Sequence, residues 1–184
     1  MSQFDFLQLA VYVGLLVLLT KPLGIFMSHI FQGEKTFLST PLGWLERLSY
    51  KVTGVDEKRE MNWKEYAWAL LSFNIIGIIF VFIIQLLQGV LPLNPQNLSG
   101  VTWHSALNTA VSFVTNTNWQ GYAGETTMSY FTQMLALTVQ NFVSAAVGIA
   151  VAIALTCGIA NRSKGTIGNF WADLTRGIVY LLLL

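Results

Sequence analysis

Apolar residues gather in five runs along the chain, separated by polar segments. Three of the runs are long, at about residues 6–31, 66–87 and 128–156. A helix needs about 20 apolar residues to cross a hydrocarbon core about 30 Å thick, so each of these runs can span a membrane. Residues 101–114 would form a helix of only about 20 Å, which is too short to cross. The fifth run begins at Ile178 and stops after seven residues at Leu184, so we expect the chain to be a fragment of something longer.

Composition points to the same class of protein. The chain is 54% hydrophobic and 10% charged, whereas soluble domains carry roughly 25% charged residues. We therefore expect an integral membrane protein. The net charge of +1, without a basic cluster among aromatic residues, excludes a nucleic-acid partner. A single cysteine, Cys157, excludes a disulfide framework.

Basic residues orient the apolar runs. All ten Lys and Arg lie in two windows, residues 21–64 and 162–176. By the positive-inside rule both windows are cytoplasmic, which places the N-terminus and residues 88–127 outside. No basic residue precedes the first run, so a retained spanning helix is favoured over a signal peptide. The short run 101–114 must then enter and leave from the outer side, as a re-entrant half-helix.

The first basic window contains its own helical pattern. Thr40 and Pro41 precede Leu42, Leu45, Leu48 and Val52, and Gly54 closes the pattern. This spacing predicts a capped amphipathic helix that lies along the membrane face. A docking surface for a partner protein is the alternative.

The short run leads into a polar stretch, residues 115–121, called the polar segment below. Irregular backbone in a membrane must be buried in protein or line a watery cavity, because unpaired amides are costly there. The carbonyl end of the preceding helix favours cations. No carboxylate lies within residues 115–123, and neutral oxygens suit a monovalent ion. We expect this segment to be an ion-coordinating strand with backbone carbonyls and threonine hydroxyls as ligands; a polar extracellular hairpin is the alternative.

Neighbouring polar residues add to this hypothesis. Glu125 could concentrate cations at an outer mouth or cap the next helix. One face of the run after it carries Gln133, Gln140, Asn141 and Ser144. That face could line a pore or pack against another helix. The sequence shows no Ser/His/Asp or Cys/His set and no phosphate loop.

Several motifs resemble the KdpA family, the potassium-binding subunits of bacterial Kdp transporters. They are REMNW (59–63), LPLNPQ (91–96), ALNTAVSFVTNTNWQGYAGETT (106–127) and TVQNF (138–142). The resemblance implies an all-α integral membrane fold: an extra N-terminal transmembrane helix (1–31), a cytoplasmic loop with an amphipathic helix (32–65), one helix–pore-helix–helix repeat (66–157), and a cytoplasmic loop followed by the start of a further transmembrane helix (158–184). By this resemblance, Thr115, Asn116, Thr117 and Asn118 form the K⁺ filter strand, supported by Trp119, Gln120, Gly121 and Glu125. Potassium-channel filters typically have glycine where this segment has Asn118, and Asn tolerates the left-handed backbone that glycine adopts there.

The same resemblance implies a function. The chain would bind extracellular K⁺ at a selectivity filter in the bacterial inner membrane and deliver it to a KdpB-type P-type ATPase, with a KdpC-type subunit as a further partner. K⁺ would be the only cofactor, with no organic group, and ATP hydrolysis would occur in the partner rather than here. The alternatives are a self-standing homotetrameric pore-loop channel and an assembly or regulatory membrane subunit without transport.

Overall fold

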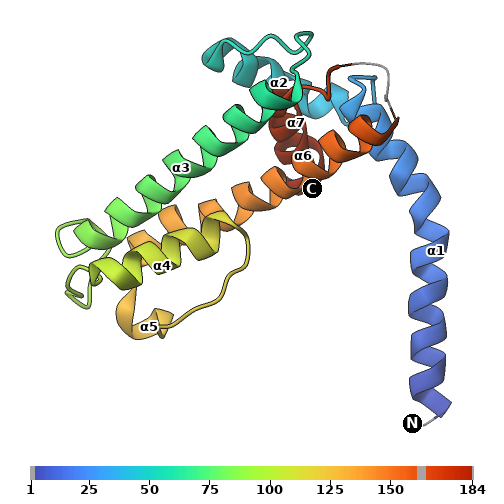
Figure 1. Cartoon of the computed structure of the whole chain (residues 1–184). Coiled ribbons are helices and arrows are strands. Elements are labelled where there is room, and N and C mark those ends of the chain that lie inside the picture. Colours follow the sequence, from blue (N-terminus) through green and yellow to red (C-terminus); the bar gives the residue numbers. More distant parts are fainter. Residues whose placement is uncertain (1–2, 161–164, 184) are drawn as a thin grey trace.

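The structure, a computed structural model, describes residues 3–160 and 165–183, and the regular elements in that part of the chain are helices joined by turns and loops. Three helical stretches are long and apolar enough to cross a membrane (Figure 1). They are α1 (Gln3–Phe31), α3 (Trp63–Leu87), and the continuous stretch formed by the π-helix η1 (Thr132–Thr138) and α6 (Val139–Ala160). The expected all-α membrane class is confirmed. The shorter elements are α2 (Ser39–Thr53), α4 (Trp103–Val114), α5 (Gly124–Thr127), α7 (Phe170–Gly177) and the π-helix η2 (Ile178–Leu182).

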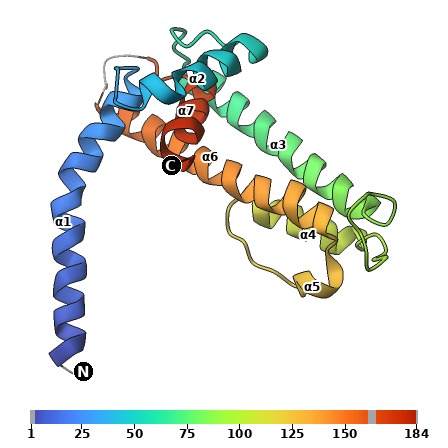
Figure 2. The same cartoon turned by 180° about the vertical axis from the view of Figure 1, so that it is seen from behind.

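Helix α1 stands apart from the other long helices (Figures 1 and 2). None of its most apolar window is buried by the rest of the described chain. The helix continues through Pro22. Proline removes one backbone hydrogen bond from a helix interior but does not by itself end it.

Helix α3 begins at a complete capping box. The Asn62 side chain accepts from the backbone N–H groups of Lys64 and Glu65, and the Glu65 carboxylate accepts from Asn62 N. Such a cap satisfies the free donors of the first turn and contributes about 1 kcal/mol. The start of α3 is thereby fixed three residues before the apolar run predicted from Tyr66.

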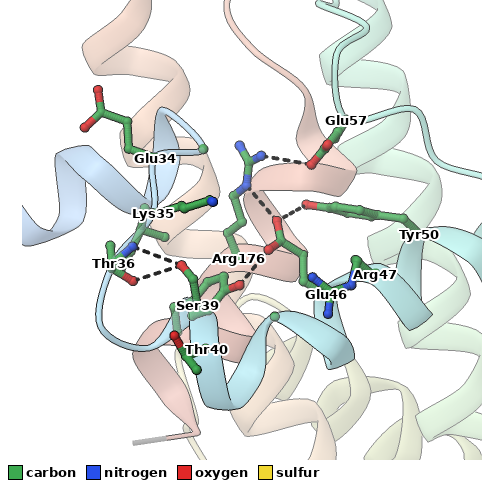
Figure 3. A pocket seen from close by; sticks show the side chains of 14 residues that line it. Glu34, Lys35, Thr36, Ser39, Thr40, Glu46, Arg47, Tyr50, Glu57 and Arg176 are labelled. Carbon is green, nitrogen blue, oxygen red and sulfur yellow. Dashed lines mark hydrogen bonds and ion pairs between the residues drawn. The ribbon is translucent and has the colours of Figure 1, made fainter.

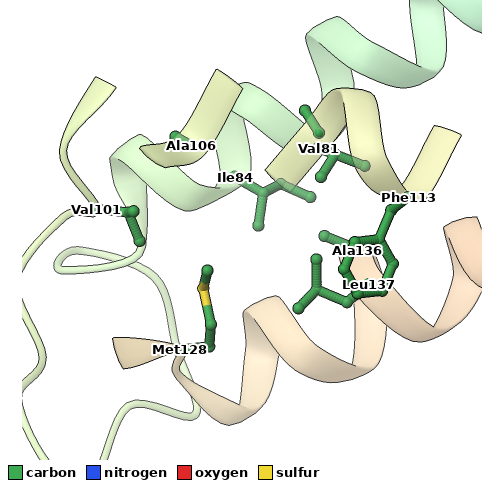
Figure 4. Close-up of a cluster of buried hydrophobic side chains, with 9 residues drawn as sticks. Val81, Ile84, Val101, Ala106, Phe113, Met128, Ala136 and Leu137 are labelled. Carbon is green, nitrogen blue, oxygen red and sulfur yellow. The ribbon is translucent and has the colours of Figure 1, made fainter. Parts of the chain in front are cut away.

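Helix α4 packs between α3 and the η1–α6 stretch. Figure 4 shows the core at this contact, which is built from apolar side chains of α3, α4 and η1, with Val101 and Met128 from the neighbouring loops. Its fully buried alanines, Ala106, Ala110 and Ala136, let the helices approach closely. The cluster consists of Val81, Ile84, Val101, Ala106, Ala110, Phe113, Met128, Ala136 and Leu137.

A second core lies toward the start of α3. Phe170, fully buried, makes edge-on ring contacts with Tyr66 and Phe73 of α3, at centroid distances of 5.5 and 5.8 Å. Edge-to-face pairs of this kind add about 0.5–1.5 kcal/mol beyond burial. They hold α7 against α3.

Helix α2 covers the end of α1 and the start of η2. It begins at Ser39 with no side-chain cap, so the expected cap at Thr40 is absent, and it ends at Gly54 in the left-handed conformation, as expected from the sequence. Leu38 at its start packs with Ile30 and Val179. Arg162 and Lys164, two of the basic residues used to orient the chain, lie outside the described residues.

Candidate functional site

The polar segment and α4 form an excursion that starts and finishes at one end of α3. The Gln88 side chain, fully buried beside the last turn of α3, joins both ends of the excursion. Its Nε2 donates to Ser99 O at 2.7 Å, in the loop before α4, and to the carbonyl of Thr127, the last residue of α5, at 2.8 Å. Its Oε1 accepts from Ser129 N at 3.0 Å. Figures 1 and 2 show α4 running part of the way back along α3 and the chain then returning to α5.

The backbone of the polar segment contains both right-handed and left-handed conformations. Thr115 has φ −83° and ψ 2°, whereas Asn116 and Asn118 are left-handed, with φ 56° and 54°. Asparagine tolerates this conformation better than other residues with a Cβ, so the tolerance expected for Asn118 is confirmed. A right-handed residue followed by a left-handed one makes successive N–H groups converge.

These N–H groups all point back to α4. Asn116 N donates to Phe113 O at 3.2 Å, while Thr117 N and Asn118 N donate to Ser112 O at 3.0 and 3.3 Å. In a trans peptide unit, the C=O points opposite to the N–H that follows it. The carbonyl oxygens of residues 115, 116 and 117 are therefore directed away from α4, as a row of neutral oxygens on one side of the segment.

Hydroxyl groups brace the same segment. Thr115 Oγ1 donates to Val111 O at 2.8 Å and lies 3.1 Å from Thr117 Oγ1, which itself donates to Ser112 O at 3.1 Å. The Ser112 hydroxyl donates to Trp119 O at 2.8 Å. Because both threonine hydroxyls can give their protons to backbone carbonyls, the backbone oxygens are the better candidates for ion ligands.

The segment is open in this chain. Residues 115–121 are all exposed, and Trp119 is 46% exposed. Glu125 is exposed in the first turn of α5. The described residues thus brace the segment on the α4 side and leave the carbonyl side uncovered.

The four polar residues that the sequence places on one face of the η1–α6 stretch have different surroundings in the structure. Gln133 Nε2 donates to Gly124 O and Met128 O, which ties α5 to η1. Gln140 is buried against α3, where a Cβ on Gly77 would lie 3.1 Å from its Oε1. Asn141 is exposed. Ser144 Oγ donates to Asn116 Oδ1 of the polar segment at 3.3 Å, and also to Asn141 O at 3.2 Å.

Two important residues of this region are absent from the sequence-based expectations. Ser112 lies within an apolar helix, and Gln88 follows one, so neither stands out by pattern. Ser112 could have been found only from its position, because it is a polar residue on the helix face that carries Ala106, Thr109 and Phe113. Gln88 offered only its position at the end of an apolar run.

A charged cluster occupies the other end of α3, at a cavity of about 610 Å³ (Figure 3). Arg176 donates to Glu46 at 3.1 Å, to Glu57 at 3.3 Å and to the carbonyl of Phe31 at 3.2 Å. It therefore joins the end of α1, α2 and the loop before α3. Burial raises the pKa of Glu46, but hydrogen bonds from Tyr180, Tyr50 and Arg176 outweigh burial and hold that pKa below its usual 4.5.

Comparison with known proteins identifies the family. The sequence model described as "Potassium-transporting ATPase A subunit", KdpA, matches residues 10–184. A potassium-transporting ATPase potassium-binding subunit of Pseudomonas syringae pv. tomato is 53% identical over 183 residues, which cover 100% of this chain and 32% of that protein. The proteins of the same name from Ralstonia nicotianae and Geobacter metallireducens are 56% and 52% identical, over 96% and 100% of this chain and 30% and 31% of their own lengths.

The chain thus spans about a third of the length of the curated relatives that it matches. The match extends through both long helices that flank α4 and through the polar segment itself. This chain belongs to the KdpA family of potassium-transporting ATPase A subunits.

Proposed function

We propose that this chain is part of the potassium-binding subunit of an ATP-driven K⁺ uptake complex in a bacterial plasma membrane. It binds extracellular K⁺ and passes it to a KdpB-type P-type ATPase, which hydrolyses ATP, with a KdpC-type subunit as a further partner. The chain itself is non-catalytic and needs no organic cofactor. The names of the relatives support potassium binding and an ATPase complex.

The proposed topology follows from charge and from the course of the chain. Residues 21–64 and the segment after α6 face the cytoplasm, because they carry the basic residues. Helix α4 is a re-entrant pore helix from the outer side. The bonds of Gln88 to both Ser99 and Thr127 support this, because they bring the two ends of the excursion to the same end of α3.

The observation that carries the proposal is the row of backbone carbonyls at residues 115–117. Neutral carbonyl oxygens replace the hydration shell of a monovalent cation and still release it. The negative pole of α4 points to the same region and favours a cation there. One segment supplies only part of a coordination shell, so we propose that other parts of the complete subunit supply the remaining oxygens on the exposed side.

The test uses the complete subunit that contains this chain, purified in complex with its partner subunits. Isothermal titration measures K⁺ and Ca²⁺ binding to the wild type and to Asn118→Asp. A carboxylate at this position adds a charged ligand that favours divalent ions, so we expect at least about a tenfold change in the Kd for K⁺ and stronger Ca²⁺ binding, in the range that changes near a bound metal produce.

Asn97→Asp is the matched control. Asn97 is also an exposed, left-handed asparagine, with φ 51°, but it lies in the loop before α4. This variant should bind K⁺ like the wild type. Equal K⁺ and Ca²⁺ binding by Asn118→Asp and Asn97→Asp would refute the assignment of the polar segment as the ion site.

A further inference from the structure

Ser112 contacts the polar segment through both its backbone and its side chain. It is fully buried in the last turn of α4. If α4 continued, the Ser112 carbonyl would accept from residue 116. Instead it accepts from the N–H groups of Thr117 and Asn118, at 3.0 and 3.3 Å, and from Thr117 Oγ1 at 3.1 Å. The carbonyl of Ser112 therefore holds the middle of the segment.

The hydroxyl of Ser112 holds the far end. It donates to Trp119 O at 2.8 Å, the first residue after the two left-handed positions. The chain from Ser112 to Trp119 is thereby closed into a loop at a single residue. Without the hydroxyl, the carbonyl of Trp119 is no longer joined to α4, and the described residues give it no other hydrogen-bond donor.

The contacts that the asparagine side chains of the segment make are longer. Ser144 Oγ reaches Asn116 Oδ1 at 3.3 Å, and Asn118 Nδ2 reaches the same oxygen at 3.3 Å. Both join flexible side chains rather than the backbone. Neither can fix the direction of a carbonyl group in the way that the bond from Ser112 to a backbone oxygen does.

We infer that the Ser112 hydroxyl is a positioning group that sets the preference for K⁺ over Na⁺, an inference that rests on the proposed function. It fixes the chain at Trp119, just beyond the row of carbonyls at residues 115–117, so that the oxygens of the row stay at the spacing of the larger ion. When the segment loosens, its oxygens can close around Na⁺, and discrimination falls. Groups that orient ligands from the second layer typically change metal affinity by 10–100-fold when they are removed.

The experiment compares Ser112→Ala with the wild type in the complete subunit within its complex. Equilibrium binding of ⁸⁶Rb⁺, displaced by K⁺ or by Na⁺, gives both affinities, and K⁺-stimulated ATP hydrolysis gives the maximal rate. We expect Ser112→Ala to lower the ratio of K⁺ to Na⁺ affinity by about 10-fold or more, with the maximal rate at saturating K⁺ retained. A merely structural role would lower binding of both ions and the maximal rate together.

Two further variants complete the test. Ser105→Ala removes a hydroxyl from the same helix, two turns earlier, and should retain wild-type selectivity. Ser112→Thr retains the hydroxyl and should restore the affinity ratio; it also decides the matter if Ser112→Ala fails to fold. Wild-type selectivity in Ser112→Ala, or its loss in a folded Ser112→Thr, would overturn the role of Ser112. A wild-type complex that does not prefer K⁺ to Na⁺ would instead overturn the proposed function.

Discussion

Gly100 offers the sharpest test of how α4 is held against α3. A Cβ at this position would lie 2.3 Å from the carbonyl oxygen of Leu86, in the last turn of α3. The neighbouring backbone is fixed as well, because Val101 N donates to Gln85 O at 3.0 Å. Gly100 is not one of the described glycines with a left-handed backbone, so the constraint on this position is steric rather than conformational.

The expected cost of Gly100→Ala follows from this contact. A helix carbonyl cannot rotate aside as a flexible side chain can, so the start of α4 must shift. Overpacking in well-packed regions costs about 1–3 kcal/mol, against a gain of about 0.4–1 kcal/mol from restricting the unfolded chain. The middle of these ranges gives a net loss of about 1 kcal/mol, which corresponds to a fall of roughly 2–4 °C in Tm for a chain of this size.

Thermal unfolding of the purified protein in detergent measures the effect. Gly121→Ala is the matched control, because a Cβ there meets no atom within 4 Å and the backbone is not left-handed. That variant should be as stable as the wild type or slightly more stable. If both variants unfold at the wild-type temperature, α4 does not approach α3 as closely as the structure indicates, and the argument for the fixed excursion is refuted.

Three further predictions concern the other end of α3 and helix α2. Arg176→Met leaves Glu46 without its buried partner and should cost about 3 kcal/mol in thermal unfolding. Arg59→Met breaks an exposed pair with Glu65 and should lower Tm far less; equal losses in the two variants would contradict the burial argument. Burial raises the pKa of Asp173 to about 7, against opposing effects of Tyr66 and Arg176, so its folded pKa exceeds its usual 3.8. Protonation then favours the folded state: this contribution is full below pH 3.8, is lost as pH rises to about 7, and should vanish from the pH profile of Tm in Asp173→Asn. Finally, Trp44, 55% exposed on α2, should be quenched by brominated lipids if α2 lies in the membrane interface, as its spacing predicts; quenching by a water-soluble quencher alone would contradict this.

The sequence by itself determined the class of protein and the order of its segments. Three apolar runs of spanning length and one short run predict the long helices and α4, because helix length is set by the thickness of the hydrocarbon core. The limits of α4 agree within two residues with the run at 101–114. The order of polar and apolar residues also identified the polar segment. Uncharged amides and hydroxyls between apolar runs are costly in a membrane unless they are buried in protein or line a watery cavity.

Only the tertiary structure decided how that segment is held. The spacing of Gln133, Gln140 and Ser144 predicts that they share one face of the helix after α5. In the structure, Gln133 bonds to α5, Gln140 packs on α3 and Ser144 contacts Asn116. Periodicity defines a face, but the neighbours of that face depend on contacts between residues far apart in the chain. Ser112 could not be recognised from the sequence for the same reason. Its importance comes from the backbone N–H groups and the carbonyl that the folded turn brings to it.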